Sequence, residues 1–218
     1  MKLLVTRPEP GASATAARLR TLGYEAVTLP CLSITPLPPH LPAHPAAVVV
    51  TSGQAVAALP ASLHNTPCFC VGDATAAKLR GAGFTRVESA QGNADDLAKL
   101  VIARAVPGLH LLAVGERQGM ALEARLREAG MSVVRRKVYR AAPLRVLPAG
   151  FALDGLGGAL FYSAETARAF LRLKPPGTAA LTAFALSDAV AAALKPLPWR
   201  EIRAAVAPTE ADLMALLP

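Results

Sequence analysis

The stretch Arg18-Leu19-Arg20-Thr21-Leu22-Gly23 has a counterpart 107 residues later, Arg125-Leu126-Arg127-Glu128-Ala129-Gly130. In both, basic residues flank an apolar position and a glycine follows, which is typical of the end of a helix. Three further pairs keep the same order at offsets of 111, 115 and 116: Thr51-Ser52 with Tyr162-Ser163, Gly72-Asp73-Ala74 with Ser187-Asp188-Ala189, and Asp96-Leu97 with Asp212-Leu213. A slowly growing offset indicates a duplicated unit, so the sequence predicts two similar lobes with a ligand site at the seam between them.

Short apolar runs alternate with longer helical stretches in both halves of the chain. The runs lie at 3–5, 26–29, 47–50 and 68–71, and again at 111–114, 133–134, 159–162 and 182–186. Such an alternation favours parallel sheets that are covered by helices on both faces. We therefore expect an α/β protein with two flavodoxin-like lobes.

Two proline-bearing segments occupy equivalent places in the repeat. They are Thr35-Pro36-Leu37-Pro38-Pro39 and Ala142-Pro143, the latter followed by Pro148. Prolines make stiff spacers that do not pack into a core, so we expect the chain to cross between the lobes here. The resulting division is lobe one at 1–35 plus 146–218, lobe two at 41–136, and linkers at 36–40 and 137–145.

Composition limits the classes of partner. The 218 residues are 53% hydrophobic and 17% charged, which suits two lobes of roughly 100 residues each. The net charge of +8 favours an anionic partner. Only 5% of residues are aromatic, and no helix-turn-helix, zinc-finger or RNA-binding motif is present. A small polyanion explains the charge as well as nucleic acid does, and an Arg- and Ala-rich composition explains it without any partner.

The cysteines and the N-terminus predict a cytoplasmic protein. The count of three cysteines is odd, and Cys68 and Cys70 point to one face of a strand, as expected of buried, reduced thiols. The first apolar run turns polar at Thr6-Arg7, before the core of a signal peptide could form, and no membrane span follows. Pro39, Pro42 and Pro45 lie beside and between His40 and His44 and preclude a shared helix, so we expect no metal site.

Small hydroxyl residues stand where predicted strands end. Helix N-termini at such points bind anions through backbone N–H groups and hydroxyls. The candidates are Thr6, Thr51, Ser52, Thr75, Ser163 and Ser187. Helix capping requires the same residue types and is the alternative for each one. Their presence in both halves favours a ligand.

No nucleophile or phosphate-loop motif is present. Asp73 and Asp188 are possible acids, but a carboxylate at a helix start is also favourable for stability alone, and Tyr139 is the stronger candidate. Tyr139 lies in the basic stretch Arg135-Arg136-Lys137-Val138-Tyr139-Arg140, beside the second predicted crossing. A phenol there could donate a proton while the cations attract carboxylates. The alternative is a tyrosine with its ring packed inward and its hydroxyl in water.

Motifs along nearly the whole chain resemble the uroporphyrinogen-III synthase family. They are Val5-Thr6-Arg7-Pro8, Leu22-Gly23-Tyr24, Leu29-Pro30, Thr51-Ser52-x-x-Ala55-Val56, Val71-Gly72-x-Ala74-Thr75-Ala76-x-x-Leu79, Gly83-Phe84, Val138-Tyr139-Arg140, Tyr162-Ser163 and Ala207-Pro208-Thr209. The resemblance implies two lobes joined by a two-stranded linker. It also implies a lyase that cyclises hydroxymethylbilane to uroporphyrinogen III, with loss of water and inversion of ring D, without metal or cofactor.

The resemblance also implies roles for particular residues. Tyr139 matches the family's tyrosine and is the expected proton donor. Thr51, Ser52, Thr75 and Ser163 would bind the eight substrate carboxylates, with Arg7 at the rim. The sequence departs from the family at Ser187-Asp188-Ala189-Val190, where Gly-Pro-Thr-Thr is common, so Ser187 would substitute only in part.

Two other classes of function compete with the enzyme. A non-catalytic two-lobe binding protein would close on a small polyanion without converting it. A nucleic-acid regulator would show salt-sensitive retention on DNA. No long heptad or large apolar patch demands a protein partner, so we expect a monomer.

Overall fold

The computed structural model describes residues 1–218, which divide into two compact units. Unit 1 comprises Met1–Ser33 and Ala142–Pro218, and unit 2 comprises Ile34–Ala141. The chain therefore leaves unit 1 early, completes unit 2 and returns. The segments expected as linkers, 36–40 and 137–145, fall partly within two extended strands.

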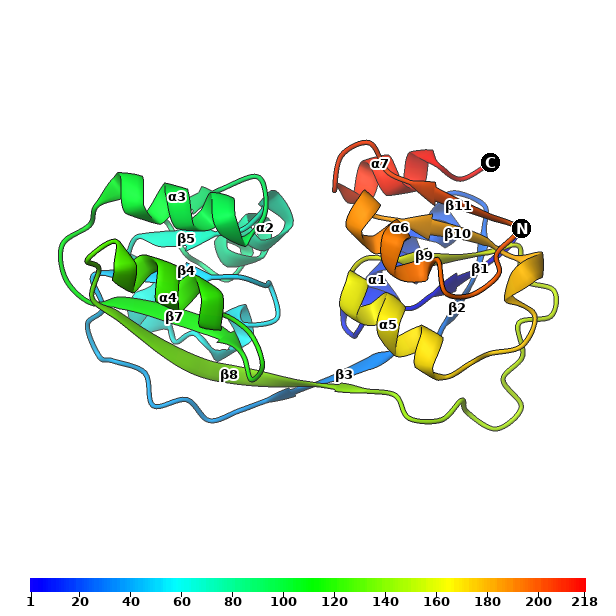
Figure 1. The fold of residues 1–218 in the computed structure, drawn as a ribbon, viewed down its shortest axis with the longest axis horizontal. Coiled ribbons are helices and arrows are strands. Elements are labelled where there is room, and N and C mark those ends of the chain that lie inside the picture. Colours follow the sequence, from blue (N-terminus) through cyan, green and yellow to red (C-terminus); the bar gives the residue numbers. More distant parts are fainter. The chain divides into compact units, whose positions relative to one another are not determined.

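Unit 1 contains a five-stranded parallel sheet in the order β11-β10-β9-β1-β2 (Figure 1). When the five strands are numbered 1 to 5 along the chain, their order in the sheet is 2-1-3-4-5, as in a flavodoxin-like sheet. Their bounds are β1 (Lys2–Val5), β2 (Glu25–Thr28), β9 (Gly158–Phe161), β10 (Thr182–Ala185) and β11 (Glu201–Ala204).

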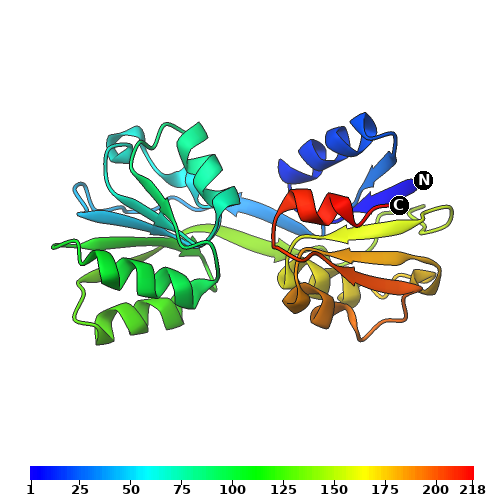
Figure 2. The same cartoon turned by 90° about the horizontal axis from the view of Figure 1, so that it is seen from above.

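Helices cover both faces of this sheet (Figure 2). One face packs against α1 (Gly11–Thr21) and α7 (Glu210–Ala215), and the other against α5 (Ala164–Arg172) and α6 (Asp188–Leu194). Strand β1 shows the reason. Leu3 and Val5 pack in the core beneath α1 and α7, and Leu4 packs in the core beneath α5 and α6. Side chains alternate along a strand, so a run that is apolar throughout requires a core on each face.

Unit 2 contains a six-stranded sheet in the order β3-β8-β7-β4-β5-β6. The strands are β3 (Leu32–Pro36), β4 (Ala47–Val50), β5 (Cys68–Cys70), β6 (Val87–Ser89), β7 (His110–Gly115) and β8 (Val133–Pro143). One face packs against α2 (Asp73–Gly81) and the short helices η1 (Val56–Ala58) and η2 (Ala61–Leu63), and the other against α3 (Ala94–Arg104) and α4 (Met120–Glu128). Unit 1 also contains the short helix η3 (Thr178–Ala180).

Strands β3 and β8 carry the two crossings between the units. The Leu37 N–H donates to the Val138 carbonyl at 3.0 Å, and the Leu144 N–H donates to the Cys31 carbonyl at 2.9 Å. The partner's number falls as the strand's number rises, so the pair is antiparallel. The prediction of two α/β lobes with parallel sheets and a two-stranded connection is confirmed.

The duplicated halves do not coincide with the units. The first half supplies β1, α1 and β2 to unit 1 and β4 through α3 to unit 2, and the second half does the reverse. Each unit therefore combines a strand pair from one half with a strand triplet from the other. This exchange explains why repeat-related residues such as Ser52 and Ser163 lie at equivalent strand ends in different units.

The three cysteines are buried and unpaired, as expected. Burial raises the pKa of the Cys31 and Cys68 thiols to about 12, and that of Cys70 to about 11. None of the helices combines the length and the apolar character that crossing a membrane requires.

Gly158 gives a test of packing in unit 1. A Cβ at this position would lie 2.5 Å from Cε2 of Phe184 and 2.7 Å from the Thr182 carbonyl oxygen, which belongs to the paired strand. We expect Gly158→Ala to lower the free energy of unfolding by about 1–3 kcal/mol, since backbone cannot move aside easily. Gly81→Ala is the control, because no atom lies within 4 Å of the added carbon. Equal urea midpoints for both variants would contradict this packing.

Candidate functional site

Each sheet has one point where the strand order reverses. These points lie between β1 and β9 in unit 1 and between β7 and β4 in unit 2. Ligands of open α/β sheets bind outside the carboxyl ends of the strands next to such a reversal. The residues that directly follow these ends are Thr6 and Arg7, Tyr162 and Ser163, Thr51 and Ser52, and Glu116. We call the two groups the carboxyl edges of units 1 and 2.

At the carboxyl edge of unit 2, the Thr51 hydroxyl is buried without a hydrogen-bond partner. Its neighbour Ser52 accepts from the Gln54 N–H at 3.3 Å, so this hydroxyl shapes the following turn. Thr75 is half-buried in the first turn of α2. The N-cap of α2 is Gly72, which has no side chain to cap the first N–H groups. Unmet hydroxyl and amide groups at one edge suit an anionic ligand.

Lys78 joins this edge and was not identified from the sequence. A Cβ on Gly53 would lie 2.6 Å from Cδ and 3.2 Å from Nζ of Lys78, so the lysine side chain lies over the Gly53 backbone. Lys78 follows Thr75 by three residues on α2, and that spacing places both on one helix face. The spacing was the only signal available in the sequence.

Tyr139 lies on β8 with 3% of its surface exposed. Its ring packs in the core of unit 2, while its hydroxyl donates to Oε1 of Gln118 at 2.8 Å. The inward ring agrees with the packing alternative, but the hydroxyl bonds to a protein side chain. The Glu116 N–H donates to the Tyr139 carbonyl at 2.9 Å, which fixes the backbone beside it.

A register shift between β7 and β8 sets the position of this ring. Val114 pairs with Lys137, whereas the next residue, Gly115, pairs with Tyr139. A Cβ on Gly115 would lie 2.8 Å from Cζ and 3.0 Å from the hydroxyl oxygen of Tyr139. The phenol therefore lies against the end of β7, in a space that only glycine leaves open.

The basic residues around Tyr139 are engaged with acceptors of unit 2. Arg140 donates to both Glu116 carboxylate oxygens at 2.9 and 3.0 Å, and this bond lowers the pKa of Glu116. Arg135 donates to Glu123 at 2.9 Å, and Arg136 donates to a backbone carbonyl. In this structure the three arginines stabilise β8, which carries Tyr139, and the loop that follows β7.

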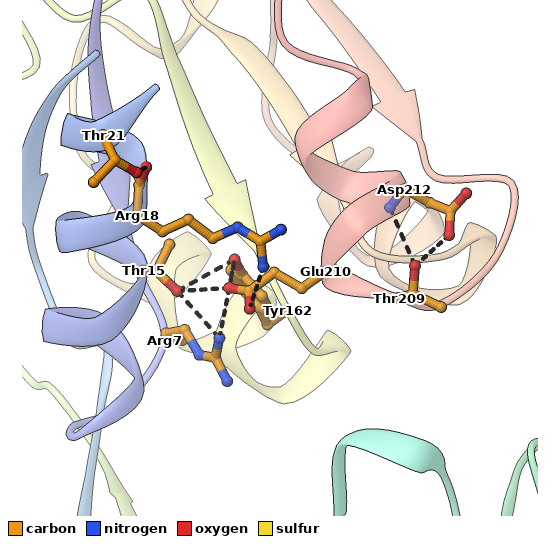
Figure 3. Close-up of polar contacts among 8 residues, drawn as sticks. All are labelled: Arg7, Thr15, Arg18, Thr21, Tyr162, Thr209, Glu210 and Asp212. Atoms are coloured by element: carbon orange, nitrogen blue, oxygen red, sulfur yellow. Dashed lines mark hydrogen bonds and ion pairs between the residues drawn. The ribbon is translucent and has the colours of Figure 1, made fainter. Parts of the chain in front are cut away.

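The carboxyl edge of unit 1 contains a polar cluster centred on Glu210 (Figure 3). Its Oε1 accepts from Tyr162 at 2.8 Å, from Thr15 at 3.0 Å and from Nη1 of Arg7 at 3.3 Å. Arg18 approaches Oε2 at 3.5 Å. Four donors, two of them cationic, thus converge on one carboxylate.

Arg7 is partly buried within this cluster. Only 23% of its side chain is exposed, and its guanidinium lies 4.0 Å from the centroid of the Tyr162 ring. Burial raises the pKa of Tyr162, so its phenol stays protonated and donates to Glu210.

The two serines of unit 1 differ in their contacts. The Ser163 hydroxyl caps α5, because it accepts from the Thr166 N–H at 3.1 Å and donates to the Thr166 hydroxyl at 2.9 Å. Ser187 precedes α6 but makes no side-chain cap. The Ser163 hydroxyl therefore caps α5, whereas the Ser187 hydroxyl makes no capping contact.

The structure brings the candidate residues together as two sets. Strands β8, β7, β4 and β5 are consecutive neighbours, so Tyr139, Thr51, Ser52 and Thr75 share one edge of unit 2. Arg7, Ser163 and Ser187 share the carboxyl edge of unit 1. No three His, Cys, Asp or Glu side chains are arranged to hold a metal ion.

The fold and its polar edges define a class, two-unit α/β proteins with flavodoxin-like sheets. Two solved structures share this fold across the chain. A uroporphyrinogen-III synthetase from Helicobacter pylori is 19% identical with a TM-score of 0.66, covering 99% of this chain and 98% of its own. A mutant uroporphyrinogen III synthase from Thermus thermophilus is 18% identical with a TM-score of 0.57, covering 99% and 97%.

The sequence model of the uroporphyrinogen-III synthase HemD family matches residues 13–215, and the chain belongs to this family. It is a lyase of tetrapyrrole biosynthesis, and the expected reaction is the cyclisation of hydroxymethylbilane. The alternative of a non-catalytic binding protein is not favoured. A comparison with curated protein sequences finds no match.

The contacts of Glu210 predict that its loss lowers the stability of the protein more than the loss of a surface glutamate does. Glu210→Ala removes the shared acceptor of three hydrogen bonds, and we expect a loss of about 2 kcal/mol in the free energy of unfolding. Glu201→Ala is the control, because Glu201 pairs with Arg203 on the surface and such pairs contribute less than about 1 kcal/mol. Urea unfolding measures both. Equal losses would show that the cluster does not stabilise unit 1.

Proposed function

We propose that the carboxyl edge of unit 2 is the catalytic edge and that Tyr139 donates the proton that starts the reaction. The observation that carries this assignment is the position of the Tyr139 hydroxyl, which the register shift places against Gly115 at the end of β7, at the edge that also carries Thr51, Ser52 and Thr75. Its phenol proton is ionisable, unlike those of the Thr51, Ser52 and Thr75 hydroxyls at the same edge.

The chemistry begins with the loss of the substrate's hydroxyl. As the phenol proton moves to that oxygen, the carbon–oxygen bond breaks, water departs and an electrophilic azafulvene remains on ring A. Ring D then attacks through its substituted carbon, forms a spiro intermediate and recloses in inverted orientation. Ring closure depends mostly on orientation, for which amides and hydroxyls are suitable groups.

Within each unit taken by itself, we propose that hydroxyls and amides at the carboxyl edge are ligands for substrate carboxylates. Unit 2 supplies Thr51, Ser52 and Thr75, supported by the uncapped first turn of α2. Unit 1 supplies Arg7, Ser163 and Ser187. The net charge of +8 favours the approach of a substrate with eight carboxylates.

The proposal also includes the setting of the enzyme. We propose a cytoplasmic monomer that needs no metal or cofactor and binds no nucleic acid. The buried, unpaired cysteines support a reducing compartment.

Product analysis tests the activity. Purified protein is given freshly generated hydroxymethylbilane, and the ring isomers of the product are separated. We expect uroporphyrinogen III. Formation of type I isomer alone, as occurs spontaneously, would refute the enzymatic assignment.

A conservative substitution tests the acid. We expect Tyr139→Phe to lower kcat by roughly 10²–10⁴-fold, the range for a general acid, with folding intact by circular dichroism. Tyr24→Phe is the control, since the Tyr24 hydroxyl bonds to the Pro218 carbonyl away from either edge. Turnover by Tyr139→Phe equal to that of the parent would remove Tyr139 from the proton step.

A further inference from the structure

The hydroxyl proton of Tyr139 is engaged in a hydrogen bond within unit 2. The phenol donates to Oε1 of Gln118 at 2.8 Å, and the tyrosine is 3% exposed. A phenol carries one proton and donates one hydrogen bond at a time. While Gln118 accepts that proton, Tyr139 cannot direct it at a leaving hydroxyl.

Gln118 carries a group that can reverse this contact. Its amide ends in one acceptor oxygen and one NH₂ donor, which exchange places when the amide turns by half a rotation. After the turn, Nε2–H donates to the phenol oxygen, and the phenol proton is released toward the substrate. As the proton leaves, the same N–H meets the developing phenolate in a charge-assisted hydrogen bond.

The backbone of Gln118 is fixed by two hydrogen bonds. Its N–H donates to the Gly115 carbonyl at 3.0 Å, and its carbonyl accepts from Nη1 of Arg135 at 3.1 Å. Arg135 is fixed in turn by Glu123 at 2.9 Å. The next residue, Gly119, has φ +81°, a left-handed conformation that favours glycine. A loop anchored in this way keeps the amide within reach of Tyr139.

We propose that Gln118 is a positioning residue that directs the Tyr139 proton, accepting it in the free enzyme and stabilising the phenolate when the substrate loses its hydroxyl. The inference rests on the proposed role of Tyr139. In the step itself, the carbon–oxygen bond breaks with its electron pair on oxygen, which takes the phenol proton and leaves as water. The phenolate regains a proton when the closing macrocycle loses one, so water is the only net loss.

Two substitutions distinguish this role from a purely structural one, in which Gln118 only accepts a hydrogen bond from the buried Tyr139 hydroxyl. Gln118→Met removes both donor and acceptor, whereas Gln118→Glu, ionised near pH 8, keeps an acceptor for the phenol but has no N–H. We expect both to lower kcat by roughly 10- to 100-fold, the contribution of a hydrogen bond to a charged group. Thermal melting confirms that each variant is folded. A Gln118→Glu enzyme with the parent kcat would overturn the proposal, because a purely structural acceptor is preserved.

A double-mutant cycle shows whether Gln118 acts through Tyr139. In the Tyr139→Phe background, Gln118→Met should change kcat by less than about twofold, since no phenolate remains to stabilise. A full additional loss would overturn the proposal. If Tyr139→Phe lowers kcat and Gln118→Met does not, only the inference about Gln118 fails. If Tyr139→Phe has no effect, the proton role proposed for Tyr139 fails first.

Discussion

The carboxyl edge of unit 2, which we propose as the catalytic edge, depends on the register shift between β7 and β8. One extra residue on β8 brings Tyr139 opposite Gly115, and the missing side chain of that glycine leaves the space that the phenol fills. The same shift places the Glu116 N–H on the Tyr139 carbonyl. A local irregularity in a parallel ladder thus converts a core tyrosine into one whose hydroxyl reaches the edge of the sheet.

Parallel pairing accounts for the rest of the arrangement. Every strand of a parallel sheet ends at the same edge. Hydroxyl residues that follow different strands therefore lie at one edge even when the strands are far apart in the sequence. The duplication repeats this edge in both units. Each half places its first strand pair (β1–β2 or β7–β8) in one unit and its other strands in the other unit, so the chain crosses twice between the units. The two edges have diverged: that of unit 1 is organised around Glu210, and that of unit 2 around Tyr139.

The sequence was sufficient for the fold and for the positions of the residues that follow the strand ends. Alternating apolar runs predicted the sheets, and strand-end hydroxyls predicted which residues follow the carboxyl ends. Contacts of long sequence separation were not predictable: Arg7 and Glu210 are 203 residues apart, and nothing local indicates that they pair. Gln118 was missed for another reason, since its contact with Tyr139 depends on a register shift that no periodicity shows.

Hydrogen exchange with and without uroporphyrinogen III tests most directly whether the carboxyl edge of unit 2 holds the macrocycle. The account predicts slower exchange at 51–54, 72–75 and 115–118 when the product is bound. Protection confined to the opposite edge of the same sheet, at 43–46, 106–109 and 130–132, would contradict it.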